Sequence, residues 1–256
     1  DCDSAQIEAR VLAWLAGQDD LVEAFRNKQD VYKIMASHIY NVPVAEVTPA
    51  QRQVGKTVIL GAGYGVGHAK LQLFLKTTAK VDVDVAEAKR IIDTYRETYP
   101  RIPALWRKAQ AALTAMNNKQ ESIIDVHGIC RTDEVGITLP SGLHIQYPNL
   151  QSVEGDKGVQ WTYTSKGSET KVYGGLVVEN FTQAIARCVV AEQMLRIAKR
   201  YFVPMMVHDA AAALAREEEA DEARAYVEEC MSWTPKWAAG LPLACESGMG
   251  ASYGDC

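Results

Sequence analysis

The stretch from Thr48 to Gly67, TPAQRQVGKTVILGAGYGVG, constrains the fold most strongly because it signals both ends of one helix. Thr48 is a favourable N-cap residue, Pro49 suits the first helical position, and Gln51 completes a Thr-x-x-Gln capping box. A cluster of glycines closes the stretch, as is typical of a helix C-terminus. The sequence therefore predicts a helix over 49–64.

One face of this predicted helix carries two cations, an apolar residue and a ring. Arg52, Lys56, Leu60 and Tyr64 follow one another at four-residue intervals, so they drift only about 40° per step around a helix. Such a face can bind a polyphosphate at one end and stack a flat ring at the other. On its own, the stretch is more simply interpreted as a solvated amphipathic surface helix. A choice between this interpretation and a nucleotide-binding face requires evidence from the rest of the chain.

Composition narrows the class of protein. The chain has 256 residues, 48% of them hydrophobic, which is enough for one large domain or two subdomains. Its net charge of −5 means that phosphate binding requires locally placed cations. The scattered cysteines, without a Cys-x-x-Cys pair, are typical of reduced thiols in the cytoplasm. No apolar run approaches the length of about 18 residues that a membrane helix needs, so we expect no membrane partner.

Helical patterns fill the first part of the chain. The segment QIEARVLAWLAG places apolar residues on one stripe, and Asp3 stands just ahead of it. Further helices are expected at 20–27, 30–40, 49–64, 85–97 and 102–118.

The period changes to two between 121 and 172, which predicts a β-rich insertion whose turns include Pro140–Gly142 and Gly155-Asp156. A long helix is expected from about 175 to 202. The following segment VPMMVHDAAAALA predicts a tight hairpin with His208 and Asp209 at its tip, and an acidic segment near the end predicts an amphipathic helix with Ala223, Ala225, Tyr226 and Cys230 facing inward. The predicted fold class is α+β.

Asp3 and Asp209 both stand at the edges of apolar elements. Such a pair can hold a divalent metal, because hard cations such as Mg²⁺ take carboxylate oxygens and leave other positions to water and substrate phosphate. A helix cap for Asp3 and a turn residue for Asp209 are the simpler alternatives. The glycine cluster matches neither the P-loop nor the dinucleotide fingerprint.

Taken together, three stretches resemble the motifs of the family A (polymerase-I-like) DNA polymerases. DSAQIEAR from Asp3 to Arg10 resembles motif A, usually D-x-S-Q-I-E-x-R. The series from Arg52 to Tyr64-Gly65 resembles motif B, and Val207-His208-Asp209 resembles motif C. The segments DVYKIMASHIYNVPVAEVTPAQR and TYRETYPRIPALW resemble the family's fingers, and the closing CESGMGASYGDC is similar in style to phage members.

This resemblance implies an antiparallel-sheet palm with a helical fingers subdomain. Residues 1–19 and 173–256 would form the palm, and 20–172 the fingers. The implied function is template-directed DNA polymerisation, in which dNTPs extend a primer 3′-hydroxyl with release of pyrophosphate. Asp3 and Asp209 would hold two Mg²⁺ ions, which Mn²⁺ can replace.

The resemblance also implies how the nucleotide binds. Arg52 and Lys56 would grip the β- and γ-phosphates, and Lys56 could also donate a proton. Leu60 would pack on the incoming base or sugar. Tyr64 would lie at the template base with its ring against Glu8, which would crowd the 2′ position and disfavour ribonucleotides.

Primer-template DNA would also meet residues of the palm. Gln183 resembles the glutamine that reads the minor groove near the primer end, and His208 would lie near the primer terminus. A bacterial host cytoplasm is the expected location if the chain is phage-encoded.

At several positions this sequence departs from the usual motifs of the family, and these departures limit which functional roles the resemblance implies. Ala210 replaces the usual Glu of motif C, so we expect reduced activity. Leu60 replaces Phe or Tyr, Ala5 replaces Ser, and Glu179 replaces Asn. The family's thumb and exonuclease regions are absent from this chain and are expected upstream in a parent chain. Without them, primer-template would be held weakly and proofreading would be lost.

Two other functions stay open at this point. A single-subunit RNA polymerase shares similar motifs, although Glu8 argues against it. The presence of Ala210 in place of the usual Glu keeps a catalytically silent nucleic-acid-binding fragment open as the other alternative. His38, His68, His127 and His144 lack ligand spacing and are expected to be structural or at the surface. Trp161 and Tyr163 alternate on a strand, where a plain sheet face is a simpler reading than base stacking.

Overall fold

The computed structural model describes residues 1–155 and 158–256, and the predicted turn residue Asp156 lies outside them. The chain divides into two compact units, the first made of 1–11 and 183–256 and the second of 12–182. The sequence predicts subdomain boundaries at 19/20 and 172/173, whereas the units divide at 11/12 and 182/183. Both divisions fall inside helices, α1 (Ile7–Ala16) and α8 (Gly174–Ile197).

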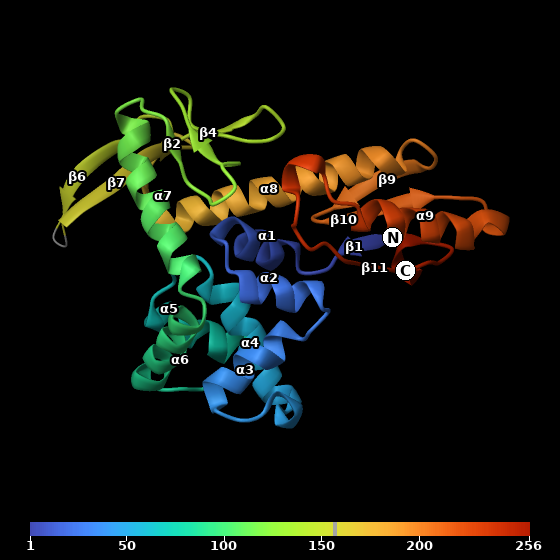
Figure 1. Cartoon of the computed structure of the whole chain (residues 1–256), viewed down its shortest axis with the longest axis horizontal. Coiled ribbons are helices and arrows are strands. Elements are labelled where there is room, and N and C mark those ends of the chain that lie inside the picture. Colours follow the sequence, from blue (N-terminus) through green and yellow to red (C-terminus); the bar gives the residue numbers. More distant parts are fainter. Residues whose placement is uncertain (156–157) are drawn as a thin grey trace. The chain divides into compact units, whose positions relative to one another are not determined.

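The first unit is built on a four-stranded antiparallel sheet with the order β11-β1-β10-β9. Its strands are β1 (Cys2–Ser4), β9 (Phe202–Val207), β10 (Ala210–Leu214) and β11 (Cys245–Ser247). Helix α9 (Ala220–Ser232) contacts β1 and β11 and covers one face of the sheet (Figure 1). Cys2 and Ala211 are fully buried and paired, so the centre of the sheet faces this core.

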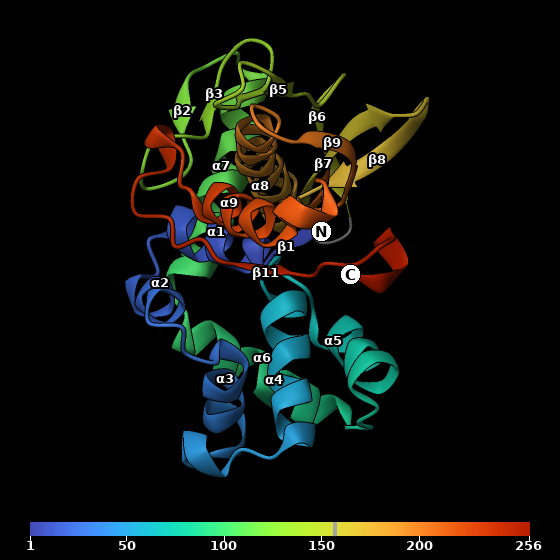
Figure 2. The same cartoon turned by 90° about the vertical axis from the view of Figure 1, so that its right-hand side faces the viewer.

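The second unit begins with helices, as the sequence predicts. They are α2 (Asp19–Arg26), α3 (Val31–Tyr40), α4 (Pro49–Ala62), α5 (His68–Phe74), α6 (Val85–Thr98) and α7 (Arg101–Asn117). Helices α3, α4 and α6 pack on one another (Figure 2), with Met35, Val58 and Ile91 almost fully buried. Asp30 caps α3 and Thr48 caps α4 through the expected capping box.

The β-rich insertion forms two antiparallel sheets rather than one continuous layer. The first contains β2 (Ser122–Ile123), β3 (Arg131–Thr132), β4 (Ile137–Thr138) and β5 (His144–Ile145), and the second contains β6 (Gln151–Gly155), β7 (Gly158–Ser165) and β8 (Ser168–Val172). The predicted run from Ser122 to Cys130 is a strand only at its start. Its later part is a loop, in which the buried Asp125 carboxylate accepts the backbone N–H groups of His127 and Cys130.

Three helix predictions need correction. The helix expected over 49–64 ends at Ala62, because Gly63 caps it and Gly65 takes the left-handed conformation with φ +76. The long helix expected to reach 202 ends at Ile197. In α9, Ala225 is exposed and Val227 is buried instead, because Val227 is four residues from Ala223 and shares its face.

The antiparallel sheets and surrounding helices confirm the α+β class. Among the residues that the structure describes, no helix is long and apolar enough to cross a bilayer.

Candidate active site

Strand pairing brings the two predicted acids together. Asp3 lies in the middle of β1 directly opposite Ala210 on β10, and the backbone N–H of Ser4 donates to the carbonyl of Asp209 at 3.2 Å. Along β1, Cys2 and Ser4 are buried while Asp3 is exposed, so its carboxylate projects from the open face of the sheet. Residues from opposite ends of the chain thus meet on adjacent strands.

The pKa of Asp3 is consistent with its position near Asp209. The pKa of Asp3 is raised above its usual value, first by partial burial and then by the negative charges of Asp209 and Glu246. Glu246 stands opposite Asp3 on β11, on the side away from β10. Glu246 was not predicted as a site residue, because nothing in the closing segment CESGMGASYGDC indicates that it pairs with β1.

The hairpin tip is as predicted, with His208 and Asp209 as the two residues between β9 and β10. His208 is exposed and takes a left-handed backbone conformation with φ 55, which is uncommon for a non-glycine residue. Holding that conformation costs about 1–2 kcal/mol. This conformation fits the tight two-residue turn between β9 and β10.

The turn after β1 is tied to the same sheet by Arg10. This buried side chain donates from Nε to the carbonyl of Ala5 at 2.7 Å and from Nη1 to the carbonyl of Pro242 at 3.3 Å. The motif A arginine therefore fixes the backbone that presents Asp3. Glu8 is half-buried and Gln183 is exposed, each on the part of its helix that belongs to the first unit.

The second unit presents the predicted nucleotide-binding face on α4. Lys56 is exposed, Leu60 is 45% exposed, and Arg52 is partly exposed in an ion pair with Asp30 at 2.6 Å. These three share a helical face. Tyr64 is half-buried and lies beyond the helix end, in the turn that follows Gly63.

That turn is anchored within its own unit. The indole N–H of Trp106 donates to the carbonyl of Gly63 at 2.7 Å, and Arg96 donates to the carbonyl of Val66 at 3.2 Å. A Cβ on Gly175 would lie 2.3 Å from the carbonyl oxygen of Tyr64, so the start of α8 approaches this backbone closely. The position of Tyr64 is therefore set by α7 and α8 rather than by helical spacing.

Other candidates have structural partners. His127 stacks on Trp14 with ring centroids 4.2 Å apart, and His144 pairs with Asp133 at 2.7 Å. Trp161 is only 8% exposed, which favours the sheet-face reading. Tyr163 contacts Tyr147 edge to face. Among residues 1–155 and 158–256, no group of three or more His, Cys, Asp or Glu side chains is arranged to hold a metal ion.

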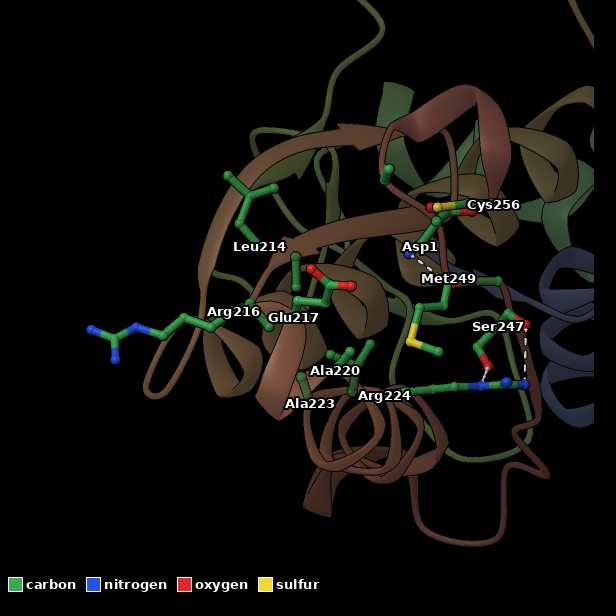
Figure 3. Close-up of a pocket in the computed structure, with 16 residues that line it drawn as sticks. Asp1, Leu214, Arg216, Glu217, Ala220, Ala223, Arg224, Ser247, Met249 and Cys256 are labelled. Atoms are coloured by element: carbon green, nitrogen blue, oxygen red, sulfur yellow. Dashed lines mark hydrogen bonds between the residues drawn. The ribbon is translucent and has the colours of Figure 1, made fainter.

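A cavity of about 520 Å³ lies elsewhere in the first unit (Figure 3). It is bounded by the end of β10, the first turns of α9 and the segment after β11, with Leu214, Val227 and Met249 in its lining. Arg224 at its border donates to the hydroxyl of Ser247 at 2.8 Å, so this cation is engaged within the fold. None of the predicted site residues lines this cavity.

Comparison with known proteins identifies the class to which this arrangement belongs. The sequence model of DNA polymerase family A matches residues 1–127. A DNA polymerase of Bacillus phage SP02 is 31% identical over 259 aligned residues, covering 95% of this chain and 39% of that relative. The chain is therefore similar to the members of DNA polymerase family A.

Two further proteins are also similar to this chain. DNA polymerase I of Treponema pallidum is 38% identical over 102 residues, which cover 40% of this chain and 10% of the relative. A solved structure of the POL domain of Pol1 from M. smegmatis, in complex with DNA primer-template and dNTP, shares the fold with a TM-score of 0.64 at 19% identity. It aligns with 98% of this chain and 39% of that structure's chain. The chain thus spans about two fifths of the phage relative's length.

Proposed function

We propose that this chain is the catalytic palm-and-fingers portion of a template-directed DNA polymerase, with the first unit as palm and the second as fingers. The observation that carries the proposal is the pairing of β1 with β10, which sets Asp3 beside the Asp209 turn. The match of residues 1–127 to the family A sequence model and the similarity to the phage DNA polymerase support the same conclusion.

The donor chemistry of this pair fits divalent metal. Asp3 and Asp209 offer hard carboxylate oxygens. Partial burial and then repulsion from Asp209 and Glu246 raise the pKa of Asp3, and a nearby cation would relieve the repulsion. Asp3 and Asp209 would hold the two Mg²⁺ ions, or Mn²⁺ in their place. Bound metal would supply charge neutralisation at the primer 3′-oxygen and at the departing pyrophosphate.

The remaining residues bind and orient the reactants. Arg52 would grip the β- and γ-phosphates with a planar fork, and the exposed Lys56 would place a compact charge beside them. Their contribution grows as negative charge develops on the leaving group, so catalysis is chiefly positioning and electrostatics. Removing Lys56 should therefore raise the KM for dNTP and lower kcat.

Other residues would select the incoming nucleotide or contact the DNA. Leu60 would pack on the incoming base or sugar, Tyr64 would lie at the template base, and Glu8 would exclude a 2′-hydroxyl. Gln183 and His208 would contact DNA near the primer end. The exposure of Gln183 and His208 supports access by a macromolecule.

Primer extension with Mg²⁺ tests the proposal. The chain is supplied with primer-template and either dNTPs or rNTPs, alongside Asp209→Asn, which keeps the side-chain shape and removes the charge. We expect dNTP-dependent extension that Asp209→Asn lowers by about a hundredfold to a thousandfold. Preferential use of rNTPs would identify an RNA polymerase.

A catalytically silent fragment predicts a different result. Wild type and Asp209→Asn would then be equally inactive, even when joined to the upstream region of the parent protein. In an active enzyme, Glu8→Ala should admit ribonucleotides more readily, and Lys56→Ala should show the kinetic change given above. Unchanged kinetics in both variants would remove these residues from the nucleotide site.

A further inference from the structure

The N-cap of α3 is bound to the first cation of the α4 face. The Oδ1 atom of Asp30 accepts the backbone N–H groups of Tyr32 and Lys33, each at 3.1 Å. Its Oδ2 atom accepts the Nε–H of Arg52 at 2.6 Å. One carboxylate therefore links the first turn of α3 to the guanidinium of α4, and its orientation is fixed by the helix that it caps.

The ring of Tyr32 lies under both cations of this face. The Cζ atom of Arg52 is 5.2 Å from the ring centroid, and the Nζ atom of Lys56 is 5.9 Å from it. Tyr32 is only 4% exposed, so the ring is held in the core of the unit. A cation over the face of a tyrosine ring is attracted by the negative quadrupole of that face. The ring therefore helps to gather two like charges.

Gly55 is what allows this arrangement. A Cβ at this position would lie 2.1 Å from the carbonyl oxygen of Tyr32 and 3.0 Å from the backbone nitrogen of Ala36. Only glycine permits so close an approach of α4 to α3. Gly55 falls between Arg52 and Lys56 in sequence, so the close approach carries both cations to the start of α3.

The ion pair between Arg52 and Asp30 leaves most N–H donors of the Arg52 guanidinium for another anion. Arginine carries five N–H donors, and the ion pair with Asp30 uses the single one on Nε. The side chains of Arg52 and Asp30 are 38% and 32% exposed, so the pair is accessible from solvent. Burial alone would raise the pKa of Asp30, but the bond from Arg52 and the two backbone N–H groups lower it, so the group stays ionised.

We propose that Asp30 is a positioning residue that holds Arg52 on the Tyr32 ring, with its terminal nitrogens presented for the phosphates of an incoming nucleotide. The inference rests on the proposed role of Arg52 and Lys56 in binding that nucleotide. An arginine that is already oriented loses less rotamer freedom when the phosphate binds. Asp30 itself need not touch the nucleotide.

Asp30→Asn separates positioning from capping, because asparagine caps helices as well as aspartate does but carries no charge. The matched control is Asp84→Asn, since Asp84 caps α6 by accepting the N–H of Glu87 at 2.7 Å. Binding of dATP and of inorganic tripolyphosphate to the 256-residue chain is measured by calorimetry. The steady-state KM for dNTP and kcat are measured by primer extension.

We expect Asp30→Asn to weaken binding of both ligands by about twofold to fivefold, which is the upper part of the range for a partly exposed charge contact. The KM for dNTP should rise by the same factor while kcat stays within about twofold, because uniform binding is lost. Asp84→Asn should leave all of these values unchanged. If Asn disturbs the fold, Asp30→Ser provides an uncharged cap for the same test.

The outcomes distinguish the inference from the function on which it rests. If Arg52→Ala abolishes ligand binding but Asp30→Asn binds like wild type, the positioning role is wrong and the nucleotide role of Arg52 stands. Tighter binding in Asp30→Asn would also overturn it, because Asp30 would then compete with phosphate. If wild type binds neither ligand and shows no extension, the proposed function itself fails.

Discussion

Asp3 on β1 lies directly opposite Ala210 on β10, and Asp209 precedes Ala210 in the hairpin tip. Family A enzymes usually carry a glutamate at the position of Ala210, so the usual third acid would face Asp3 across the ladder. Here the neighbour of Asp3 on the other side is Glu246 on β11. The acids around Asp3 therefore come from β11 and from the turn between β9 and β10.

Restoring the usual acid should have a metal-dependent effect on stability. Ala210 is only 5% exposed, and Ala210→Glu places a carboxylate opposite Asp3. Without metal, we expect this variant to be about 1 kcal/mol less stable than Ala210→Gln, which has the same size without the charge. Thermal unfolding in EDTA and in MgCl₂ measures the gap, which should narrow with Mg²⁺. Equal stability in EDTA would contradict the repulsion.

Gly55→Ala tests the close approach of α4 to α3. The added Cβ would meet backbone atoms of Tyr32 that cannot move without shifting the helix, so we expect a loss of about 1–3 kcal/mol despite the better helix propensity of alanine. Gly61→Ala is the control in the same helix, because its Cβ would meet only the Phe74 ring at 3.0 Å. Denaturant unfolding of both variants measures the difference, and equal stabilities would refute the steric argument.

Leu60→Phe tests the nucleotide face. Leu60 is 45% exposed on α4, so a larger ring should be accommodated without loss of stability. If the side chain packs on the incoming sugar, the ratio of kcat/KM for dNTPs and their sugar analogues should change by about tenfold. Leu73→Phe, at a 56% exposed position on α5, should leave this ratio unchanged. A similar ratio in all three proteins would place Leu60 outside the nucleotide site.

Cys245 should react with alkylating agents at unusually low pH. A hydrogen bond from the buried Cys2 thiol, with a further one from Ser232, lowers the pKa of Cys245 to about 6. The thiolate is the reactive form, so alkylation should reach half its maximal rate near pH 6, whereas an ordinary thiol requires a pH of about 8.5. Mass spectrometry of iodoacetamide-treated protein measures the rate, with Cys245→Ser identifying the site.

The hydrogen bond from Cys2 can be tested separately. Cys2→Ala removes the largest contribution, so the midpoint for Cys245 should move to higher pH. An unchanged midpoint would show that Cys2 does not stabilise the thiolate.

Asp133 should make stability depend on acid pH. Although burial raises its pKa, the backbone N–H groups of Val135 and Gly136 and the His144 ring together lower it. A lowered pKa in the folded state means that the stabilisation is present above the unfolded value of about 3.9 and is lost as pH falls through the folded value. Asp133→Asn, which can still accept the backbone N–H groups, isolates the charge.

At pH 7, we expect Asp133→Asn to lower the free energy of unfolding by at most about 1 kcal/mol, because the pair is partly exposed. The gap from wild type should close below about pH 4. Glu134→Gln removes the adjacent charge and should show no such closing gap. Thermal unfolding across this pH range provides the measurement, and a gap that persists at low pH would exclude an ionic origin.

The sequence by itself determined the boundaries of helices and strands that depend on local interactions, such as helix caps and tight turns. The capping box at Thr48, the cap at Asp30 and the hairpin at His208-Asp209 all appear as predicted, because each depends on residues a few positions apart. Motif spacing also led to the correct family. Predictions that extended periodicity past such signals were wrong, as with the helix end at Ala62 instead of residue 64.

Tertiary structure alone decided which distant groups meet. The pairing of Asp3 with Ala210, the position of Glu246 opposite Asp3, and the bond from Arg52 to Asp30 join segments whose own patterns do not encode register or packing distance. Asp30 was readable as a cap, but its second oxygen could be assigned to Arg52 only after Gly55 had let two helices pack closely. Capping depends on adjacent backbone atoms, whereas such contacts depend on how whole elements pack.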